Sequence, residues 1–303
     1  MNFARFIELA LYDPQLGYYR RPHPRVGFGP GTDFFTASTS GPLFGQLVTA
    51  AAVQLLGDHD PRTFTFVEVG AESAEGILAG VDHPFGSVRT QRIGETLQLD
   101  GRCVVFSNEL FDAQPFQRFV FRRGGWRELG VALRTDELVE IEISTTVPDN
   151  FPTTAPEGYV IDAPFAAATL LDELAKPAWT GLFIACDYGK SWHELIEATP
   201  AGTARAYFQH TQSNDLLARP GAQDLTCHVC WDWLAARLVA HGFSAPSLES
   251  QEAFLVKHAG AFIAATTAAE AAQFSRKKLS LLQLLHPANL GQKFQVLHAT
   301  RGV

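Results

Sequence analysis

Short apolar runs separated by polar turns dominate the hydrophobic pattern of this chain. Three of these runs, at 63–69, 103–109 and 181–189, are mostly apolar and lead into small or polar residues. Each is followed by a polar turn and a helical stretch, which is typical of parallel strands buried on both faces of one sheet. The pattern therefore predicts an α/β fold.

Helical periodicity marks other parts of the chain. The opening segment from Phe3 to about Leu11 has apolar residues at helical spacing and ends at Asp13-Pro14. The same spacing predicts helices at 45–56 and 268–285, and a stripe that Gly242 ends, formed by Trp231, Leu234, Leu238 and Val239. A last strand is expected at 294–300.

Between the second and third apolar runs the period changes from helical to alternating. RFVFRR and WRELGVAL flank Gly124-Gly125, which predicts a two-residue hairpin. LVEIEIS then alternates, with Val139, Ile141 and Ile143 on one face and glutamates on the other. We expect an antiparallel β-meander at 117–146, inserted into the α/β body.

Composition limits the classes of protein that remain. The 303 residues are 46% hydrophobic and 18% charged, which excludes wholesale disorder. A net charge of −8 argues against a nucleic-acid partner. No apolar run is long enough to span a membrane, and the start resembles neither a secretory signal nor a transit peptide. We expect a cytoplasmic protein, and the sequence carries no signal for its oligomeric state.

The chain is predicted to form one domain, 1–303, because no shift in composition marks a linker. Its first part, 1–60, would be an N-terminal helical lid, and 190–228 a substrate-side insertion. Residues 22–45 would form a long ordered loop, held by three aromatic residues, Phe34, Phe35 and Phe44.

Acidic and amide side chains gather where the predicted parallel strands end. These candidates are Glu68, Asn108, Glu109, Asp112 and Asp187. Ligands of open parallel sheets bind beyond the carboxyl ends of the strands. A group of acids there suits a cationic cofactor or substrate, although a plain solvated turn explains any one of them equally well.

The sequence resembles the MidA family of class I S-adenosylmethionine (SAM) methyltransferases, which includes mitochondrial protein-arginine methyltransferases that act in the assembly of respiratory complex I. The resemblance runs nearly from end to end and is carried by ALYDPQLGYY (10–19), GTDFFTAS (31–38), PLFG (42–45), FVEVGA (66–71), SNELFDAQPF (107–116), DYG (187–189), GTARAYFQH (202–210), PGAQDLTCHV (220–229) and LLHPANLGQKFQVL (284–297). It implies a Rossmann-like methyltransferase fold, SAM as cofactor and a protein substrate, with arginine as the acceptor.

The resemblance also implies roles for single residues. Glu68 and Gly70 fall where the family's first strand meets its glycine loop, and Asp33 falls in the family's Gly-Asp-Phe loop beside the cofactor. Asn108 and Glu109 match the Asn-Glu pair that faces the methyl group, and Asp112 and Asp187 lie in the same rim. A carboxylate that holds a guanidinium could fix one nitrogen toward the methyl group. Glu109 is the first candidate for this role and Asp112 the second.

Two features depart from the family's pattern. The glycine loop carries Glu72 and Ala74 where small turn residues are expected, and a Cβ there hinders close approach of backbone to a ligand. Only 38 positions separate Gly70 from Asn108, so the segment 76–102 has room for one short strand, with Glu95 as the acid for the ribose hydroxyls. The alternative is therefore a degenerate member that binds no cofactor and acts as an interaction or assembly factor.

Other chemical signals are weaker. Cys227 and Cys230 form a C-x-x-C, but the remaining two cysteines lie in predicted strands, so we expect no metal site. His228, His210 and Arg205 could each serve a site or pair within the protein. A nicotinamide dehydrogenase is excluded by the loop sequence, and a serine hydrolase by the missing G-x-S-x-G.

Overall fold

The computed structural model describes residues 1–21, 25–27, 32–33, 37–271 and 275–303. The chain folds into two compact units. The first unit contains Met1–Phe34, Phe111–Leu170 and Gly189–Leu234, and the second contains Phe35–Leu110, Leu171–Tyr188 and Ala235–Val303. Helices α3 (Phe165–Ala175) and α5 (Trp231–Ala240) each cross from one unit to the other along the chain. The single domain expected from composition stays a prediction.

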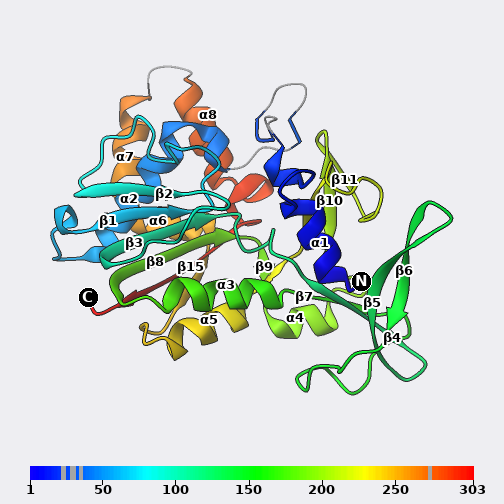
Figure 1. Ribbon diagram of the computed structural model, residues 1–303. Coiled ribbons are helices and arrows are strands. Elements are labelled where there is room, and N and C mark those ends of the chain that lie inside the picture. The colour runs from blue at the N-terminus through cyan, green and yellow to red at the C-terminus, as the bar shows by residue number, and fades with distance from the viewer. Residues whose placement is uncertain (22–24, 28–31, 34–36, 272–274) are drawn as a thin grey trace. The chain divides into compact units, whose positions relative to one another are not determined.

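A six-stranded sheet forms the centre of the second unit (Figure 1). Its strands, in spatial order, are β14 (Ser247–Ser250), β15 (Gln295–Arg301), β8 (Trp179–Asp187), β3 (Gly101–Asn108), β1 (Thr65–Val69) and β2 (Ser87–Gln91). The four strands from β8 to β2 run parallel, while β15 is antiparallel to β8 and to β14. The α/β fold with a largely parallel sheet is thus confirmed.

The order of these strands reverses direction beside β1. From β1 the chain moves outward to the edge strand β2, then returns to add β3 and β8 on the opposite side. Such a reversal is a topological switch point, where the carboxyl ends of the two central strands leave a crevice for ligands. The switch point here lies between β1 and β3, whose last paired residues are Val69 and Ser107.

The parallel strands are apolar because both of their faces are covered. Every residue from Cys103 to Ser107 is buried, so alternation is absent from β3. One face of the sheet packs against the helices that Figure 1 shows gathered on that side, which are α2 (Pro42–Leu56), α6 (Gln251–His258), α7 (Gly260–Ala269) and α8 (Arg276–Leu285).

One expectation about these strands is wrong, because β1 and β3 are not followed by helices. Residues 70–86 form turns that lead to β2, and 109–116 form turns that lead to the first unit. The covering helices come from segments before β1 and after β8. The segment 87–101 does supply one short strand, as predicted, and β2 is the last strand on that side of the described sheet.

The inserted meander is the main sheet of the first unit. Its spatial order is β6 (Glu137–Ile143), β5 (Gly125–Arg134), β4 (Gln117–Arg122) and β7 (Val160–Ala163). The hairpin turn is Arg123-Gly124, one residue earlier than predicted, with both residues at positive φ (52° and 72°) as a type I′ turn requires. The alternating burial of β6 confirms its predicted pattern. Strand β7 was not expected.

Both faces of this meander are covered by apolar clusters. The opening helix α1 (Phe3–Tyr12) buries its predicted apolar face in one cluster, which includes Val120 of β4. The residues on either side of Val120, Phe119 and Phe121, point to the opposite face and join an aromatic cluster around Trp126. The prediction of the first helix and its end at Asp13 is confirmed.

The segment 190–228 contributes small elements to the first unit. They are β9 (Gly189–Lys190), α4 (Trp192–Glu197), β10 (Arg205–Phe208), β11 (Thr211–Ser213) and β12 (Asp224–Thr226), followed by β13 (Val229–Cys230). Strands β11, β10 and β12 form a three-stranded antiparallel sheet, while β9 pairs with β13.

Several predicted helix and loop boundaries differ from the structure. Helix α2 starts at Pro42 rather than 45, since proline suits the first helical position. The single helix expected over 268–285 is two helices, because α7 ends at Ala269 and Ser275 caps a new helix by accepting from the Lys278 N–H. Val239 is 54% exposed, at the margin of its stripe. Phe34 and Phe35 lie outside the described residues.

The described helices lack the length and apolar character needed to cross a bilayer.

Candidate functional site

The turn after β1 forms one wall of the switch point. Gly70 has φ +80°, and the N–H groups of Gly70 and Ala71 both donate to the Gln91 carbonyl at the end of β2 (2.9 and 3.1 Å). A Cβ on Gly70 would lie 2.8 Å from the Leu110 Cδ1, so the turns after β1 and β3 touch. Only glycine meets both the positive φ and this close approach.

Glu68 supports this turn from beneath. Its side chain is buried, and its Oε2 accepts the Ile77 N–H at 2.6 Å, which closes the segment 70–77 onto the end of β1. Burial is the main cause that raises the pKa of Glu68 to about 7. The hydrogen bond from Ile77 lowers this pKa, and the nearby charge of Glu72 raises it further. Glu72 and Ala74 themselves are exposed.

The Asn108-Glu109 pair forms the opposite wall at the end of β3. Glu109 has φ +52°, a rare conformation for a residue with a side chain, and its N–H donates to the Cys186 carbonyl of β8. The Asn108 Nδ2 donates to the Glu109 Oε1 at 2.9 Å and so orients that carboxylate. The Asn108 Oδ1 is a buried acceptor with no hydrogen-bond partner among the described residues.

Asp187 and Glu95 follow the ends of the neighbouring strands. Asp187 is fully buried as the last residue of β8, and its Oδ1 accepts the Tyr188 N–H at 2.9 Å. Glu95 is exposed in the turn after β2, where its carboxylate accepts the Arg92 N–H at 2.8 Å.

The structure thus brings most of the candidates to one edge of one sheet. All of those in the second unit follow or end a parallel strand at its carboxyl end, namely Glu68, Gly70, Glu95, Asn108, Glu109 and Asp187. Asp33 and Asp112 belong to the first unit.

Asp33 is a buried carboxylate tied to other parts of the first unit. Its Oδ2 accepts the Tyr18 hydroxyl at 2.7 Å and its Oδ1 accepts the Gln209 N–H at 2.8 Å. The His210 N–H donates to its carbonyl. Burial and the neighbouring Asp224 and Asp33 carboxylates raise the pKa of Tyr18, which therefore keeps its proton for this hydrogen bond.

Asp112 lies in a buried acidic region of the same unit. The Cys227 N–H donates to its carbonyl, and the Tyr19 hydroxyl donates to Asp224 at 2.9 Å. Burial, with Asp224 and Asp112 contributing, raises the pKa of Tyr12 and of Tyr19. These tyrosines lie within the ALYDPQLGYY motif, and no role was predicted for them from the sequence.

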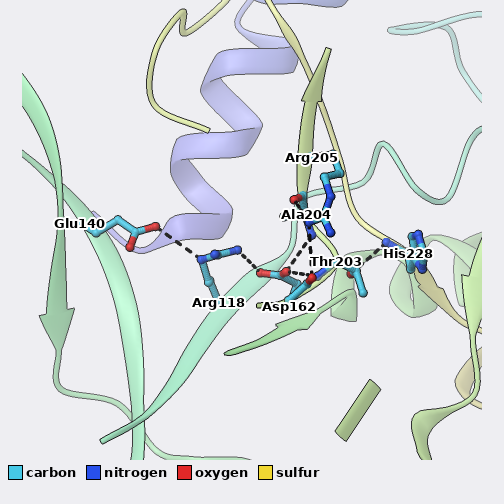
Figure 2. Close-up of polar contacts among 8 residues, drawn as sticks. Arg118, Glu140, Asp162, Thr203, Ala204, Arg205 and His228 are labelled. Carbon is cyan, nitrogen blue, oxygen red and sulfur yellow. Dashed lines mark hydrogen bonds and ion pairs between the residues drawn. The ribbon is translucent and has the colours of Figure 1, made fainter. Parts of the chain in front are cut away.

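Another buried carboxylate, Asp162 of β7, was missed by sequence reasoning. It is fully buried, and its Oδ1 accepts the Arg118 Nη1 at 2.7 Å while its Oδ2 accepts the N–H groups of Thr203 and Ala204 at 2.7 and 2.8 Å (Figure 2). The Thr203 hydroxyl in turn accepts the His228 N–H. Asp162 therefore fixes the loop before β10 to the meander.

The remaining polar candidates of the first unit pair within the protein. Arg205 donates to the carbonyl of Ala204 at 2.6 Å. Burial, with Lys190 and Arg205 nearby, lowers the pKa of His228 to about 4, so its ring is neutral near pH 7. Cys227 and Cys230 are buried and form no disulfide, and burial raises the pKa of Cys230 to about 12.

Comparison with known proteins identifies a family for this arrangement. A family described as "Putative S-adenosyl-L-methionine-dependent methyltransferase" matches residues 87–247, just over half of the chain. No curated protein matches.

Two solved structures from Burkholderia thailandensis are similar in fold. One, solved with S-adenosyl-homocysteine bound, has a TM-score of 0.87 and 24% identity over 100% of this chain and 88% of its own. The other, a native structure of an uncharacterized protein, has a TM-score of 0.83 and 23% identity with the same coverage. At these identities the likeness establishes the fold.

Proposed function

Because the chain belongs to this family of SAM-dependent methyltransferases, we propose that it transfers a methyl group from SAM to a protein side chain, with arginine as the acceptor. The observation that carries the proposal is the Asn108-Glu109 pair at the end of β3, an oriented carboxylate at the topological switch point of the sheet. That edge is where a parallel sheet of this kind holds its ligand.

The residues at this edge fit SAM. SAM is a cation with an ammonium, a sulfonium and two ribose hydroxyls, and the edge offers the carboxylates of Glu95 and Asp187. The Asn108 Oδ1, which has no hydrogen-bond partner in the described part of the chain, is a further acceptor. The left-handed turn at Gly70 presents backbone without a side chain of its own at the end of β1. The S-adenosyl-homocysteine in the Burkholderia relative supports the same cofactor here.

Each residue at the edge can be given a part in binding. We assign Glu95 to the ribose hydroxyls, because it follows β2, and Asp187 to the rim beside β8. Glu68 supports the loop, since its Oε2 accepts the Ile77 N–H, and burial raises its pKa to about 7. Asp33 and Asp112, in the first unit, remain proposed as cofactor-side and acceptor-side carboxylates.

Alignment of the acceptor is the main task left to the protein. SAM supplies an activated methyl group with a good leaving group, so no strong acid or base is needed to start transfer. A guanidinium is a poor nucleophile because its charge is delocalised over three nitrogens. Glu109 would accept hydrogen bonds from two of them, draw the positive charge toward itself and leave the third nitrogen as the nucleophile. That nitrogen would gain the methyl group as the carbon–sulfur bond breaks, and the proton it loses would pass to water. Asn108 holds the carboxylate in place for this role.

Substitution of Glu109 by glutamine tests the proposal. Glu109→Gln keeps the size of the side chain but loses a charge-assisted hydrogen bond, so we expect kcat/KM for an arginine peptide to fall by about 10- to 100-fold. SAM affinity should change by less than about threefold, because the acceptor rather than the cofactor is affected. Transfer of radiolabelled methyl groups and isothermal titration calorimetry measure the two quantities.

The controls separate the methyltransferase from its alternative. Glu142→Gln removes an exposed carboxylate from β6, in the first unit, and should leave both quantities unchanged. A peptide with lysine in place of arginine should not be labelled. Wild-type protein that binds no SAM at millimolar concentration would contradict the enzyme and favour a non-enzymatic assembly factor.

A further inference from the structure

Two histidines and a glutamate converge in the second unit, away from the switch point. Glu249 lies on the edge strand β14, His298 on the neighbouring strand β15, and His258 is the last residue of α6. Glu249 pairs with Val296 in the antiparallel ladder, so His298 is its diagonal neighbour two residues along β15. Helix α6 starts directly after β14 and brings His258 back over the same residues.

The three side chains point their ligand atoms at a common position. The Glu249 Oε1 is 3.1 Å from the His258 Nε2 and 3.0 Å from the His298 Nε2, and all three ligand atoms lie within 4.8 Å of one another. Their side chains are only 10–13% exposed. The two rings meet edge to face, with centroids 5.3 Å apart.

We propose that Glu249, His258 and His298 form a binding site for a divalent transition metal, with Zn²⁺ as the preferred ion. A tetrahedral zinc ion with bonds of about 2.0–2.2 Å needs ligand atoms about 3.4 Å apart. The two separations that involve Glu249 are within about 0.4 Å of that value. The two histidine nitrogens lie within 4.8 Å of each other, and rotation of the rings would bring them to the distance that the ion needs. Two imidazoles and one carboxylate are a ligand set that zinc uses in proteins, with water as the fourth ligand.

Zinc binds neutral imidazole and ionised carboxylate, so a metal competes with protons for these three ligands. The Nε2 atoms of His258 and His298 both contact the Glu249 Oε1, and a bound ion would replace these two contacts.

Lys257 competes with a metal for Glu249. Its ammonium lies 3.2 and 3.3 Å from the two Glu249 oxygens, and its side chain is 60% exposed. An exposed lysine can leave toward water when a metal binds, but its positive charge opposes a second cation nearby. The bound ion would join α6 to β14 and β15 and hold this edge of the sheet together.

Titration of the purified, chelator-treated chain tests the site. We expect calorimetry to show one Zn²⁺ bound per chain and Co²⁺ to give the visible absorption of a four-coordinate site. Zinc at about 100 times its dissociation constant should raise the midpoint of thermal unfolding by about 5 °C. Absence of saturable one-to-one binding would overturn the proposal.

Variants locate the bound ion. His258→Ala and Glu249→Gln should each weaken zinc binding at least tenfold, whereas Lys257→Gln should strengthen it by removing the competing charge. His193→Ala is the matched control, because His193 also contacts a carboxylate, Glu197 at 3.4 Å, but is 75% exposed. Circular dichroism of each metal-free variant establishes that it is folded. Equal zinc affinity in wild type and folded His258→Ala would contradict the site.

Discussion

Replacement of Asp162 by asparagine is expected to lower the free energy of unfolding by about 3–5 kcal/mol. The carboxylate is fully buried and accepts from Arg118 on one oxygen and from two backbone N–H groups on the other. Asparagine has nearly the same shape but replaces one oxygen with a donor, which would face a donor on either side. It also leaves the Arg118 guanidinium, whose side chain is 14% exposed, without its buried counter-charge.

Urea unfolding followed by tryptophan fluorescence measures this loss. Four of the five tryptophans lie in the first unit with Asp162, at positions 126, 192, 231 and 233, so the signal reports mainly on that unit. Arg122→Ala is the control, because it breaks the Arg122–Glu142 pair on the same sheet, whose arginine is 47% exposed, and should cost less than about 1 kcal/mol. A folded Asp162→Asn protein within 1 kcal/mol of wild type would show that the network contributes specificity rather than stability.

Local patterns in the sequence were sufficient for most of the elements. The strands β1, β3 and β8 were predicted because burial on both faces leaves a continuous apolar run, which needs no partner to be recognised. The hairpin was found from its glycines, but its turn was placed one residue late. Arg123 adopts a positive φ there, and a local glycine count cannot show which two residues turn.

Features that depend on contacts between distant residues were not predicted. β7 has only four residues and is defined by its pairing with β4, 40 to 46 positions earlier. From the sequence alone Asp162 cannot be distinguished from an exposed loop acid, because its partners Arg118 and Thr203 lie far from it along the chain. The Glu249–His298 contact spans 49 positions and follows no ligand-spacing motif, so a metal site there could not be predicted from local spacing.

The candidate site was predicted in part, for a physical reason. Carboxyl ends of parallel strands share one edge of a sheet, so acids after separate apolar runs could be grouped before the fold was known. The roles of single acids could not be separated in this way. Glu68 and Glu109 both lie near the carboxyl ends of parallel strands, yet the first is buried beneath a loop and the second is oriented by Asn108.

The buried position of Glu68 predicts a pH dependence of stability. Its pKa is about 7 in the folded chain, against 4.5 for an ordinary glutamate, mainly because burial disfavours the charged form. A carboxyl group with a raised pKa holds its proton more tightly when folded, so stability falls as pH rises from about 4.5 to 7 and is constant above. The shift corresponds to about 3 kcal/mol, and Glu68→Gln should remove this loss.

Urea unfolding of wild type and Glu68→Gln at pH 5, 6, 7 and 8 tests this expectation. The amide oxygen of glutamine can still accept the Ile77 N–H, so the variant should be nearly as stable as wild type at pH 5 and up to about 3 kcal/mol more stable at pH 8. Glu72→Gln is the matched control. Its charge is only a secondary cause of the raised pKa, so its pH profile should follow wild type closely. If the free energy of unfolding changed equally with pH in wild type and Glu68→Gln between pH 5 and 7, Glu68 would have to be solvated in the folded protein. The segment 70–77 would then be held in place by the hydrogen bonds of Gly70 and Ala71 to Gln91 and of Thr90 to the Ala74 carbonyl.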